Sequence, residues 1–375
     1  MRNKIAAIAA ASAIAMIMSA GPALAYPNGS GGTRGHASHS TPTPVTEVAS
    51  QLISPLKVAF GSNGNFLVAE SFAGQLNSYS AQGVKTTLVN APGQEIAGVS
   101  HLAGTTFYFN NDQGAGPEPG GELLPARLMS LDQHGIAHQI TDLSVFEAAN
   151  DPDGATVYGV RDASPTCLAQ APYLQSTGEL FSHPYSSAPV KGGVYVGDAG
   201  ANTLLYVSTN GNVKLVKALP AEALTIDASV VAVAAEMGMT IPECMMGLTY
   251  YAQAVPTDIE IDGQWLYYTV LPGVPGEALG VGKAYRMNVN SGTTQLLAQG
   301  LAAPTGIAVD KSNNVYVSAL FGDGVSVIKN GKVSTVLPAA MVSDVEVGGA
   351  TLAALTNSLA ETGGSLVTTG LRNGR

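Results

Sequence analysis

Two copies of an acidic pattern carry the clearest chemical signal in this 375-residue sequence. The segments Asp258-Ile259-Glu260-Ile261 and Asp344-Val345-Glu346-Val347 each place an Asp two residues before a Glu. Because side chains two residues apart on a β-strand share a face, each segment would point both carboxylates the same way. Carboxylates crowded near one axis repel one another unless a cation joins them. The pattern therefore predicts a metal site of Asp258, Glu260, Asp344 and Glu346, with Ca²⁺ as the expected ion because it binds oxygen ligands.

A structural interpretation of the same four carboxylates stays open. Each could accept hydrogen bonds from backbone N–H groups of a neighbouring sheet and so stabilise packing, because buried carboxylates are usually paired or hydrogen-bonded. Lys57 stands in its own segment where Asp258 and Asp344 stand in theirs, and His183 and Tyr185 begin another such segment. We expect these five residues to surround the mouth of a central channel and to bind a ligand. No residue is assigned a catalytic role, since a lone His in a core strand is more often structural than a general base.

The elements that position these residues are repeats. Residues 53–70, 255–270 and 303–319 each contain a Pro-led turn, an alternating apolar strand, a polar turn and a second strand. Such self-similarity at a period of about 40–50 residues indicates a propeller or a repeat array. Six units can be aligned, over residues 53–89, 96–140, 183–219, 255–301, 303–338 and 341–371. The sequence therefore predicts an all-β fold, a six-bladed β-propeller over residues 45–375.

The last unit offers only three strands, and residues 45–49 alternate in the same way as a strand. A strand from the N-terminal end would complete the last blade and leave no long sheet edge open. We therefore predict that the ring closes through both ends of the chain.

Two insertions, residues 142–182 and 220–254, fall outside the period. Residues 222–237 have apolar positions near helical spacing, which predicts one short helix. Each insertion carries one of the two cysteines, Cys167 and Cys244. An even cysteine count in an exported chain favours one disulfide over two buried thiols or a thiol nucleophile. We predict that this bond ties the insertions into a cap beside the third and fourth blades.

The N-terminal residues predict export. Residues 1–25 combine a basic start, an uncharged apolar stretch and a final Ala23-Leu24-Ala25, as a cleaved signal peptide does. Residues 26–44, rich in Gly, Ser, Thr and Pro, predict a flexible linker. No later segment reaches the length of a membrane-spanning helix, so we expect a secreted or periplasmic protein without a membrane span.

Composition and motifs exclude several classes of function. Only 12% of the residues are charged while 44 are Gly, which suits short strands joined by tight turns. The net charge is −10 and no Lys/Arg cluster occurs, so we expect no nucleic acid and no anionic membrane as partner. The chain lacks the G-x-S-x-G, P-loop, H-E-x-x-H and C-x-x-C motifs. Asp151-Pro152-Asp153-Gly154 has the start of a calcium loop without its remainder.

Several segments resemble one known family. VPTDIEIDG and LYYTVLPG within residues 255–273, PTGIAVD at 304–310, HPYS at 183–186 and YVGDAGANTLL at 195–205 carry the resemblance. They are similar to the ScyD/ScyE family of exported bacterial propeller proteins, relatives of NHL-repeat and lactonase-type propellers. The resemblance covers nearly all of the chain from residue 45 and implies a six-bladed propeller. It implies no reaction, because no catalytic residues are established for that family.

Two functions remain open on these observations. One is an exported, monomeric, non-catalytic propeller that binds a small molecule, a polysaccharide or a protein on one face, expected to be the capped one. The other is a Ca²⁺-dependent lactonase or esterase, in which a central ion polarises a carbonyl. The resemblance to lactonase-type propellers implies a Glu-x-Pro metal ligand where this chain has Ser54-Pro55-Leu56-Lys57. A Lys at that place opposes a cation, which favours the non-catalytic interpretation.

Overall fold

The structure is a computed structural model in which residues 44–112 and 123–371 are described. The predicted signal peptide and all but the last residue of the predicted linker lie outside these residues, so both stay predictions. Among the helices that are described, none combines the length and the apolar character that a membrane crossing requires.

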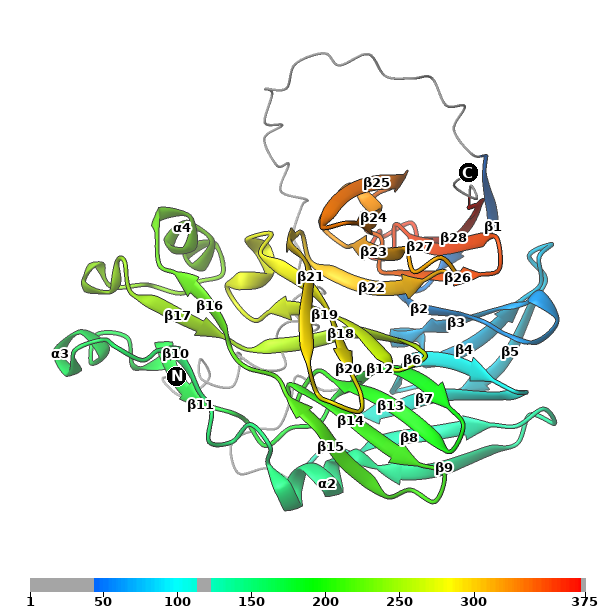
Figure 1. The fold of residues 1–375 in the computed structure, drawn as a ribbon, viewed down its shortest axis with the longest axis horizontal. Coiled ribbons are helices and arrows are strands. Elements are labelled where there is room, and N and C mark those ends of the chain that lie inside the picture. The colour runs from blue at the N-terminus through cyan, green and yellow to red at the C-terminus, as the bar shows by residue number, and fades with distance from the viewer. Residues whose placement is uncertain (1–43, 113–122, 372–375) are drawn as a thin grey trace, which may run out of the picture.

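Four-stranded antiparallel sheets make up most of the described chain (Figure 1). Five of them pair four consecutive strands in sequence order. These sheets are β2 (Pro55–Phe60), β3 (Phe66–Glu70), β4 (Gln75–Tyr79) and β5 (Lys85–Asn90); β6 (Gln94–Leu102), β7 (Thr105–Asp112), β8 (Ala126–Leu131) and β9 (Ala137–Asp142); β12 (Pro184–Val190), β13 (Gly193–Asp198), β14 (Thr203–Ser208) and β15 (Val213–Ala218); β18 (Ala254–Asp262), β19 (Trp265–Pro272), β20 (Gly282–Asn288) and β21 (Thr294–Leu301); and β22 (Pro304–Val309), β23 (Val315–Ala319), β24 (Gly324–Lys329) and β25 (Lys332–Pro338).

A further sheet combines the two ends of the described chain. Its order is β1 (Val45–Leu52), β28 (Gly364–Gly370), β27 (Thr351–Thr356) and β26 (Asp344–Gly348). β1 pairs antiparallel with β28, from Val45 opposite Thr369 to Leu52 opposite Gly364. The N-terminal strand therefore supplies the outer strand of this sheet, as the three-strand count of the last repeat predicts.

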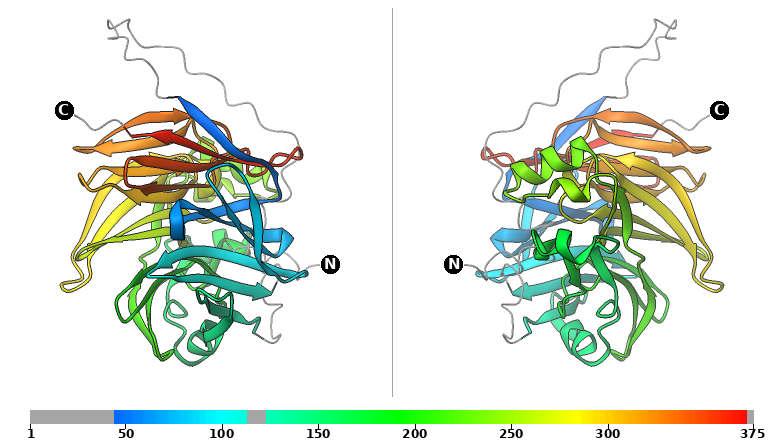
Figure 2. Two further views of the ribbon diagram at one scale, coloured as in Figure 1. Left: turned by 90° about the vertical axis from the view of Figure 1, so that its right-hand side faces the viewer. Right: turned by 90° about the vertical axis from the view of Figure 1, so that its left-hand side faces the viewer.

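One strand of each of these sheets, called its first strand here, takes part in a closed ring; it is the first in sequence in the five consecutive sheets and β26 in the sheet that combines the two ends. β2, β6, β12, β18, β22 and β26 each contact the next one in that order, and β26 contacts β2. Figure 2 shows the sheets following one another around this centre in the order of the chain. Apolar side chains fill the spaces between neighbouring sheets, for example Leu52, Val58 and Leu355 between the last sheet and the first. This packing makes each sheet depend on its two neighbours.

Removal of β1 is expected to destabilise the whole ring. A chain that lacks residues 45–52 loses the ladder to β28 and the buried Leu52, which is 3% exposed. Burial of one Leu contributes about 2–3 kcal/mol and each lost ladder bond about 0.5–1.5 kcal/mol, so the free energy of unfolding should fall by at least about 3 kcal/mol. Thermal unfolding measures the loss. The control begins at Val45 and should melt with the full chain, and equal melting of both variants would separate β1 from the fold.

Helices and a further sheet occupy the two insertions. The first insertion contains α2 (Leu143–Asn150), β10 (Val157–Val160), α3 (Pro165–Leu168), η5 (Pro172–Leu174) and β11 (Gln175–Thr177). The second contains β16 (Glu222–Thr225), α4 (Ala228–Glu236), η6 (Glu243–Met245) and β17 (Thr249–Ala252). The strands pair in the order β11-β10-β17-β16, so each insertion supplies half of one inserted sheet. Cys167 and Cys244 form a disulfide, which confirms the predicted pairing and fits an oxidising, extracytoplasmic compartment.

The helix predicted within residues 222–237 is present as α4, but its bounds and the expected number of helices are wrong. The helix α4 begins only at Ala228, because Glu222–Thr225 pairs with β17 and the Asp227 side chain caps the helix by accepting from the N–H groups of Ser229 and Val230. The helices α2 and α3 also occur, each started by a capping side chain, Asp142 and Ser164 respectively. Helices this short depend on their caps and their packing more than on apolar periodicity.

Candidate functional site

The ring of first strands brings the predicted channel residues to one level. Four of these strands carry a β-bulge at the same place, directly before Lys57, Ser186, Asp258 and Gly306. Asp344 begins its strand at the matching place. The first strand of the second sheet, β6, has the same bulge directly before Val99. The alignment of the repeats does not identify Val99 as the residue at this position. A bulge re-aims the residue beside it, which explains why these side chains converge.

Lys57 crosses the centre of the ring. Its Nζ lies 2.9 Å from Asp258 Oδ1 and 3.4 Å from Asp344 Oδ1, and donates to the carbonyl oxygen of Thr305 at 2.8 Å. The strand of Asp258, β18, stands opposite the strand of Lys57, β2, in the ring order. The ammonium also lies 5.3 Å from the centre of the Tyr185 ring. Lys57 is 2% exposed, so one buried side chain links four of the other five strands.

The two Asp residues that hold Lys57 also bind backbone groups. Asp344 Oδ2 accepts from the N–H of Val58 at 2.7 Å, and Asp258 Oδ2 accepts from the N–H of Ile307 at 2.7 Å. Burial alone would lower the pKa of Lys57, but the carboxylates of Asp258 and Asp344 outweigh it and raise that pKa. Burial raises the pKa of Asp344, against the opposing effect of Lys57. The chain's own ammonium therefore stands between the two Asp where the sequence predicts a cation, and the backbone contacts match the structural interpretation of these residues.

Glu260 and Glu346 lie one level further along the same strands, and both are partly buried. Burial, with the nearby Asp258, raises the pKa of Glu260 to about 8. Burial and the charge of Glu260 raise the pKa of Glu346. In the part of the chain that the structure describes, no Lys or Arg side chain forms an ion pair with either Glu. This pair is the portion of the predicted metal site that no basic residue neutralises, and calcium binding there stays a prediction.

His183 meets a partner that the sequence analysis does not identify. Its Nε2 lies 2.6 Å from Glu95 Oε2, and its backbone N–H donates to Asp198 Oδ1 at 2.7 Å. Burial opposes the charged imidazole, yet the Glu95 carboxylate prevails and raises the pKa of His183. Glu95 is 2% exposed, and its Oε1 has no hydrogen-bond partner within residues 44–112 and 123–371. Tyr185, from the same strand end, is also buried, and burial raises its pKa well above the usual value.

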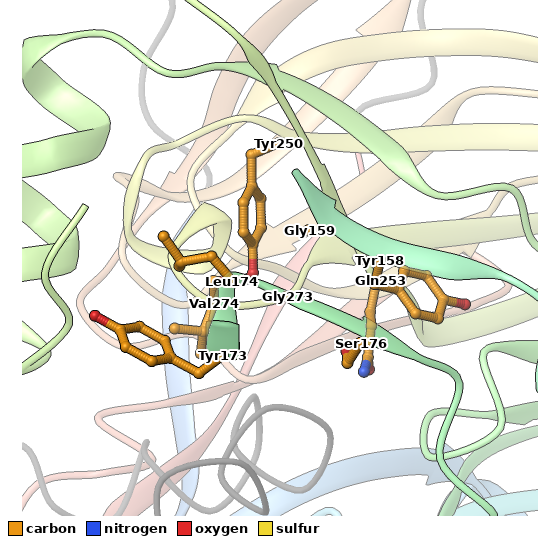
Figure 3. A pocket seen from close by; sticks show the side chains of 9 residues that line it. All are labelled: Tyr158, Gly159, Tyr173, Leu174, Ser176, Tyr250, Gln253, Gly273 and Val274. Atoms are coloured by element: carbon orange, nitrogen blue, oxygen red, sulfur yellow. Dashed lines mark hydrogen bonds between the residues drawn. The ribbon is translucent and has the colours of Figure 1, made fainter. Parts of the chain in front are cut away.

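A small pocket lies in the inserted sheet, on the face where the first strands begin. Both insertions connect the outer strand of one sheet to the first strand of the next, which places them on that face. Figure 3 shows the residues around the pocket, whose enclosed space is about 20 Å³ and which opens to solvent. Its lining consists of Tyr158, Gly159, Tyr173, Leu174, Ser176, Tyr250, Gln253, Gly273 and Val274.

The tyrosines around this pocket are fixed by their hydroxyl groups. Tyr250 donates to the carbonyl oxygen of Val274 at 3.0 Å, and Tyr173 donates to the carbonyl oxygen of Thr240 at 2.7 Å. Tyr158 donates to Asp153 Oδ2 at 2.9 Å. With the hydroxyl groups held in this way, the pocket offers ring surfaces together with the polar groups of Ser176 and Gln253, and no charged side chain.

A buried acidic cluster lies in the first insertion. Glu147, Asp151 and Asp153 each offer a carboxylate oxygen, and these oxygens all lie within 4.8 Å of one another. Burial, with the charges of Asp198, Asp153 and Asp151, raises the pKa of Glu147 to about 9. Such a cluster could bind a metal ion. The Asp-Pro-Asp-Gly sequence supplies Asp151 and Asp153, and α2 before it supplies Glu147. A calcium-loop motif continues after its first Asp, so a search for that motif does not include a residue that precedes it.

One buried acid in the connection between β19 and β20 gives a separate test of how burial affects a carboxyl group. Burial raises the pKa of Glu277 to about 8, and in the described part of the chain its Oε2 has no hydrogen-bond partner. The Glu277 carboxyl holds its proton more tightly in the folded protein than in the unfolded chain. Its contribution to the free energy of unfolding should therefore be fully present below about pH 4.5 and should decrease as the pH rises to about 8, by at most about 1.4 kcal/mol per pH unit.

The variant Glu277→Gln should unfold with a weaker dependence on pH over that range. The matched control is Glu243→Gln, which changes an exposed Glu in the second insertion and should keep the original slope. Denaturant unfolding at a series of pH values measures both slopes, and identical slopes for the two variants would contradict the assignment.

Comparisons with known proteins support the fold and leave the family open. No family model matches the sequence, and no curated protein matches it. Among solved structures, a gluconolactonase from Xanthomonas campestris is 12% identical with a TM-score of 0.53, over 88% of this chain and 89% of that one. A PQQ-bound aldose sugar dehydrogenase from Streptomyces coelicolor is 14% identical with a TM-score of 0.52, over 88% and 99%. A luciferin-regenerating enzyme is 10% identical with a TM-score of 0.52, over 88% and 96%. This likeness shows that the chain has the fold of a β-propeller.

Proposed function

We propose that the protein is an exported, monomeric, non-catalytic six-bladed propeller of the ScyD/ScyE type that binds a ligand on the face carrying the inserted sheet. The ring contacts of the six first strands support the blade count. The disulfide between the insertions supports export to an oxidising compartment.

The observation that carries this proposal is the position of Lys57. A central ion that polarises a substrate carbonyl needs carboxylates free to bind it. Asp258 and Asp344 instead hold a buried ammonium, and their other oxygens hold backbone N–H groups. At this level, the ring axis therefore contains a structural ion-pair network of Lys57, Asp258 and Asp344. Tyr185 lies beside this ion-pair network, with its ring centre 5.3 Å from Lys57 Nζ, and His183 pairs with Glu95 directly before the same strand.

The ligand that best fits the pocket is a neutral, hydroxyl-rich molecule such as a sugar unit of a polysaccharide. Aromatic rings give flat apolar surfaces, and a few polar groups fix orientation in such sites. Tyr173, Tyr250, Ser176 and Gln253 supply these two features without a charge. A charged ligand would find no counter-charge among the lining residues.

Binding of a panel of oligosaccharides to the purified mature protein tests this function. The variants Tyr173→Ala and Tyr250→Ala should weaken binding at least about tenfold, as expected for loss of an aromatic contact. Tyr251→Ala is the matched control, because Tyr251 neighbours Tyr250 in the chain but stacks on Arg161, with 3.7 Å from the guanidinium carbon to the ring centre. Calorimetry gives the affinities. Absence of binding to the whole panel, or equal losses in all three variants, would contradict the proposal.

The alternative is a metal-dependent lactonase, and one observation favours it. Glu260 and Glu346 form a carboxylate pair near the axis with raised pKa values and no basic partner among the described residues. Hydrolysis of sugar lactones with added Ca²⁺, abolished by EDTA and by Glu346→Gln, would establish this activity. A lactone panel that is not hydrolysed under either condition leaves the binding function in place.

A further inference from the structure

We propose that Glu147, Asp151 and Asp153 form a calcium site at the end of α2, separate from the ring axis and from the sugar pocket. The three residues come from one short stretch, the last turns of α2 and the Asp-Pro-Asp-Gly turn that follows it. Their ligand oxygens lie within 4.8 Å of one another. Two oxygens that each stand about 2.4 Å from one Ca²⁺ can be at most about 4.8 Å apart, so the spacing suits one ion.

Unpartnered oxygens are the first sign that a ligand belongs in this cluster. Glu147 and Asp153 are each 1% exposed. Glu147 Oε1 and Asp153 Oδ1 have no hydrogen-bond partner among the described residues, although Asp153 Oδ2 accepts from Tyr158 at 2.9 Å and from Asn202 Nδ2 at 2.8 Å. A buried carboxylate oxygen without a partner is costly, because it loses its water and gains nothing in return. A cation bound by these two oxygens would remove that cost.

Two glycines make the room that the carboxylates occupy. A side-chain carbon added at Gly154 would overlap the carboxylate of Asp151, and one added at Gly178 would overlap Asp153 Oδ1 and the Asp153 carbonyl. Neither glycine has a positive φ, so the backbone at these positions would accept other residues if the space were free. Their lack of a side chain therefore serves the close approach of the acidic groups.

The electrostatic surroundings favour a cation and give it a way in. The C-terminal end of a helix carries partial negative charge, which adds to that of the three carboxylates. Asp198 and Glu179 add further acidic groups, since Asp198 acts on Glu147 and Asp153 acts on Glu179. No ion pair between described residues involves the three ligands. The site offers only oxygen ligands, which suits Ca²⁺ better than zinc, and the exposed Asp151 leaves it open to solvent.

The same residues connect the calcium site to the inserted sheet. Tyr158 bonds to Asp153 and lines the pocket. Asn202 Nδ2 contacts both Asp153 Oδ2 and Gln253 Oε1, the latter at 3.4 Å, and Gln253 also lines the pocket. An ion on Asp153 would therefore stabilise the inserted sheet against the ring, whether or not the pocket binds a sugar.

Thermal unfolding with CaCl₂ alone, in protein first treated with EDTA, is the first measurement. At a hundredfold excess of Ca²⁺ over its Kd, the melting temperature should rise by roughly 5 °C. Tb³⁺, which occupies calcium sites, should luminesce when excited through the tyrosines, and Ca²⁺ should displace it. The variants Asp151→Asn and Glu147→Gln should lose both responses.

Two controls make the result specific. Asp162→Asn removes the same charge from an exposed position in the same insertion and should keep both responses. Glu260→Gln, at the ring axis, should also keep them, which distinguishes this site from the predicted axial one. Glu147→Gln keeps the test decisive if Asp151→Asn folds poorly, because it replaces an unpartnered buried carboxylate with a neutral group. An unchanged melting temperature with Ca²⁺, or a rise that survives in Asp151→Asn and Glu147→Gln, overturns the proposal.

Discussion

Replacement of Lys57 by methionine is expected to lower the free energy of unfolding by about 3–5 kcal/mol, because it leaves two buried carboxylates without their cation. Lys57 Nζ contacts Asp258, Asp344 and the carbonyl oxygen of Thr305, and each of these partners belongs to a different strand of the ring. Methionine fills a similar volume, so most of the loss reflects unpaired charge and not a cavity. Denaturant unfolding of the mature protein measures the change.

The charge explanation predicts a rescue. The triple variant Lys57→Met, Asp258→Asn, Asp344→Asn removes the anions together with the cation and should recover much of the stability, since a buried ion pair is often replaceable by neutral groups. Lys329→Met, at an exposed position, is the matched control and should unfold like the original chain. If Lys57→Met unfolded at the same denaturant concentration as the original chain, the ion-pair network would contribute nothing to the free energy of unfolding.

The same variants test the predicted axial calcium site. If Ca²⁺ bound Asp258 and Asp344, the double variant Asp258→Asn, Asp344→Asn would abolish any Ca²⁺-dependent rise in melting temperature. The proposed site at α2 predicts that this double variant keeps the rise, because Glu147, Asp151 and Asp153 lie in the first insertion. The two sites therefore give opposite results in one experiment.

The ring could be predicted from the sequence because its information is local and repeated. Each Pro-led turn followed by two alternating strands specifies one hairpin. The position after the bulge holds Lys57 and Asp258, as the sequence analysis expects, and Ser186 and Gly306 in two other sheets. In the second sheet the turn residues differ and Val99 takes that position, so alignment by residue type fails there. The second sheet therefore keeps the strand register and the bulge of the other sheets, although its side-chain pattern differs from theirs.

The candidate sites depend on contacts that no local pattern encodes. In the inserted sheet, Gly159 pairs with Tyr251 and Val160 pairs with Tyr250, although all of the third sheet lies between these residues along the chain. Lys57 could be placed at the channel mouth from its position in the repeat, but not in contact with the opposite strand. Glu95 has no feature that marks it as the partner of His183. In each case a long-range contact determines the role of a residue type that is otherwise ordinary.

Removal of the disulfide is expected to have the second large effect, about 4 kcal/mol. Cys167 and Cys244 are 77 residues apart, and the loss of chain entropy that a cross-link of this length imposes on the unfolded state corresponds to a stabilisation of that size. Both cysteines lie in short helical segments at the edge of the inserted sheet, with Cys167 in the small core formed by Ala171, Ile226, Val230 and Met245.

The loss should be concentrated in the insertions, because the ring is held by its own sheet-to-sheet packing while the disulfide joins one insertion to the other. The double variant Cys167→Ser, Cys244→Ser should therefore exchange amide hydrogens of β10 and β17 faster, with much smaller changes in β2 and β22. Reduction of the original chain is the matched control and should reproduce the pattern without any substitution. Two titratable thiols in the unfolded, unreduced protein, or equal exchange rates in both forms, would mean that the disulfide does not hold the inserted sheet.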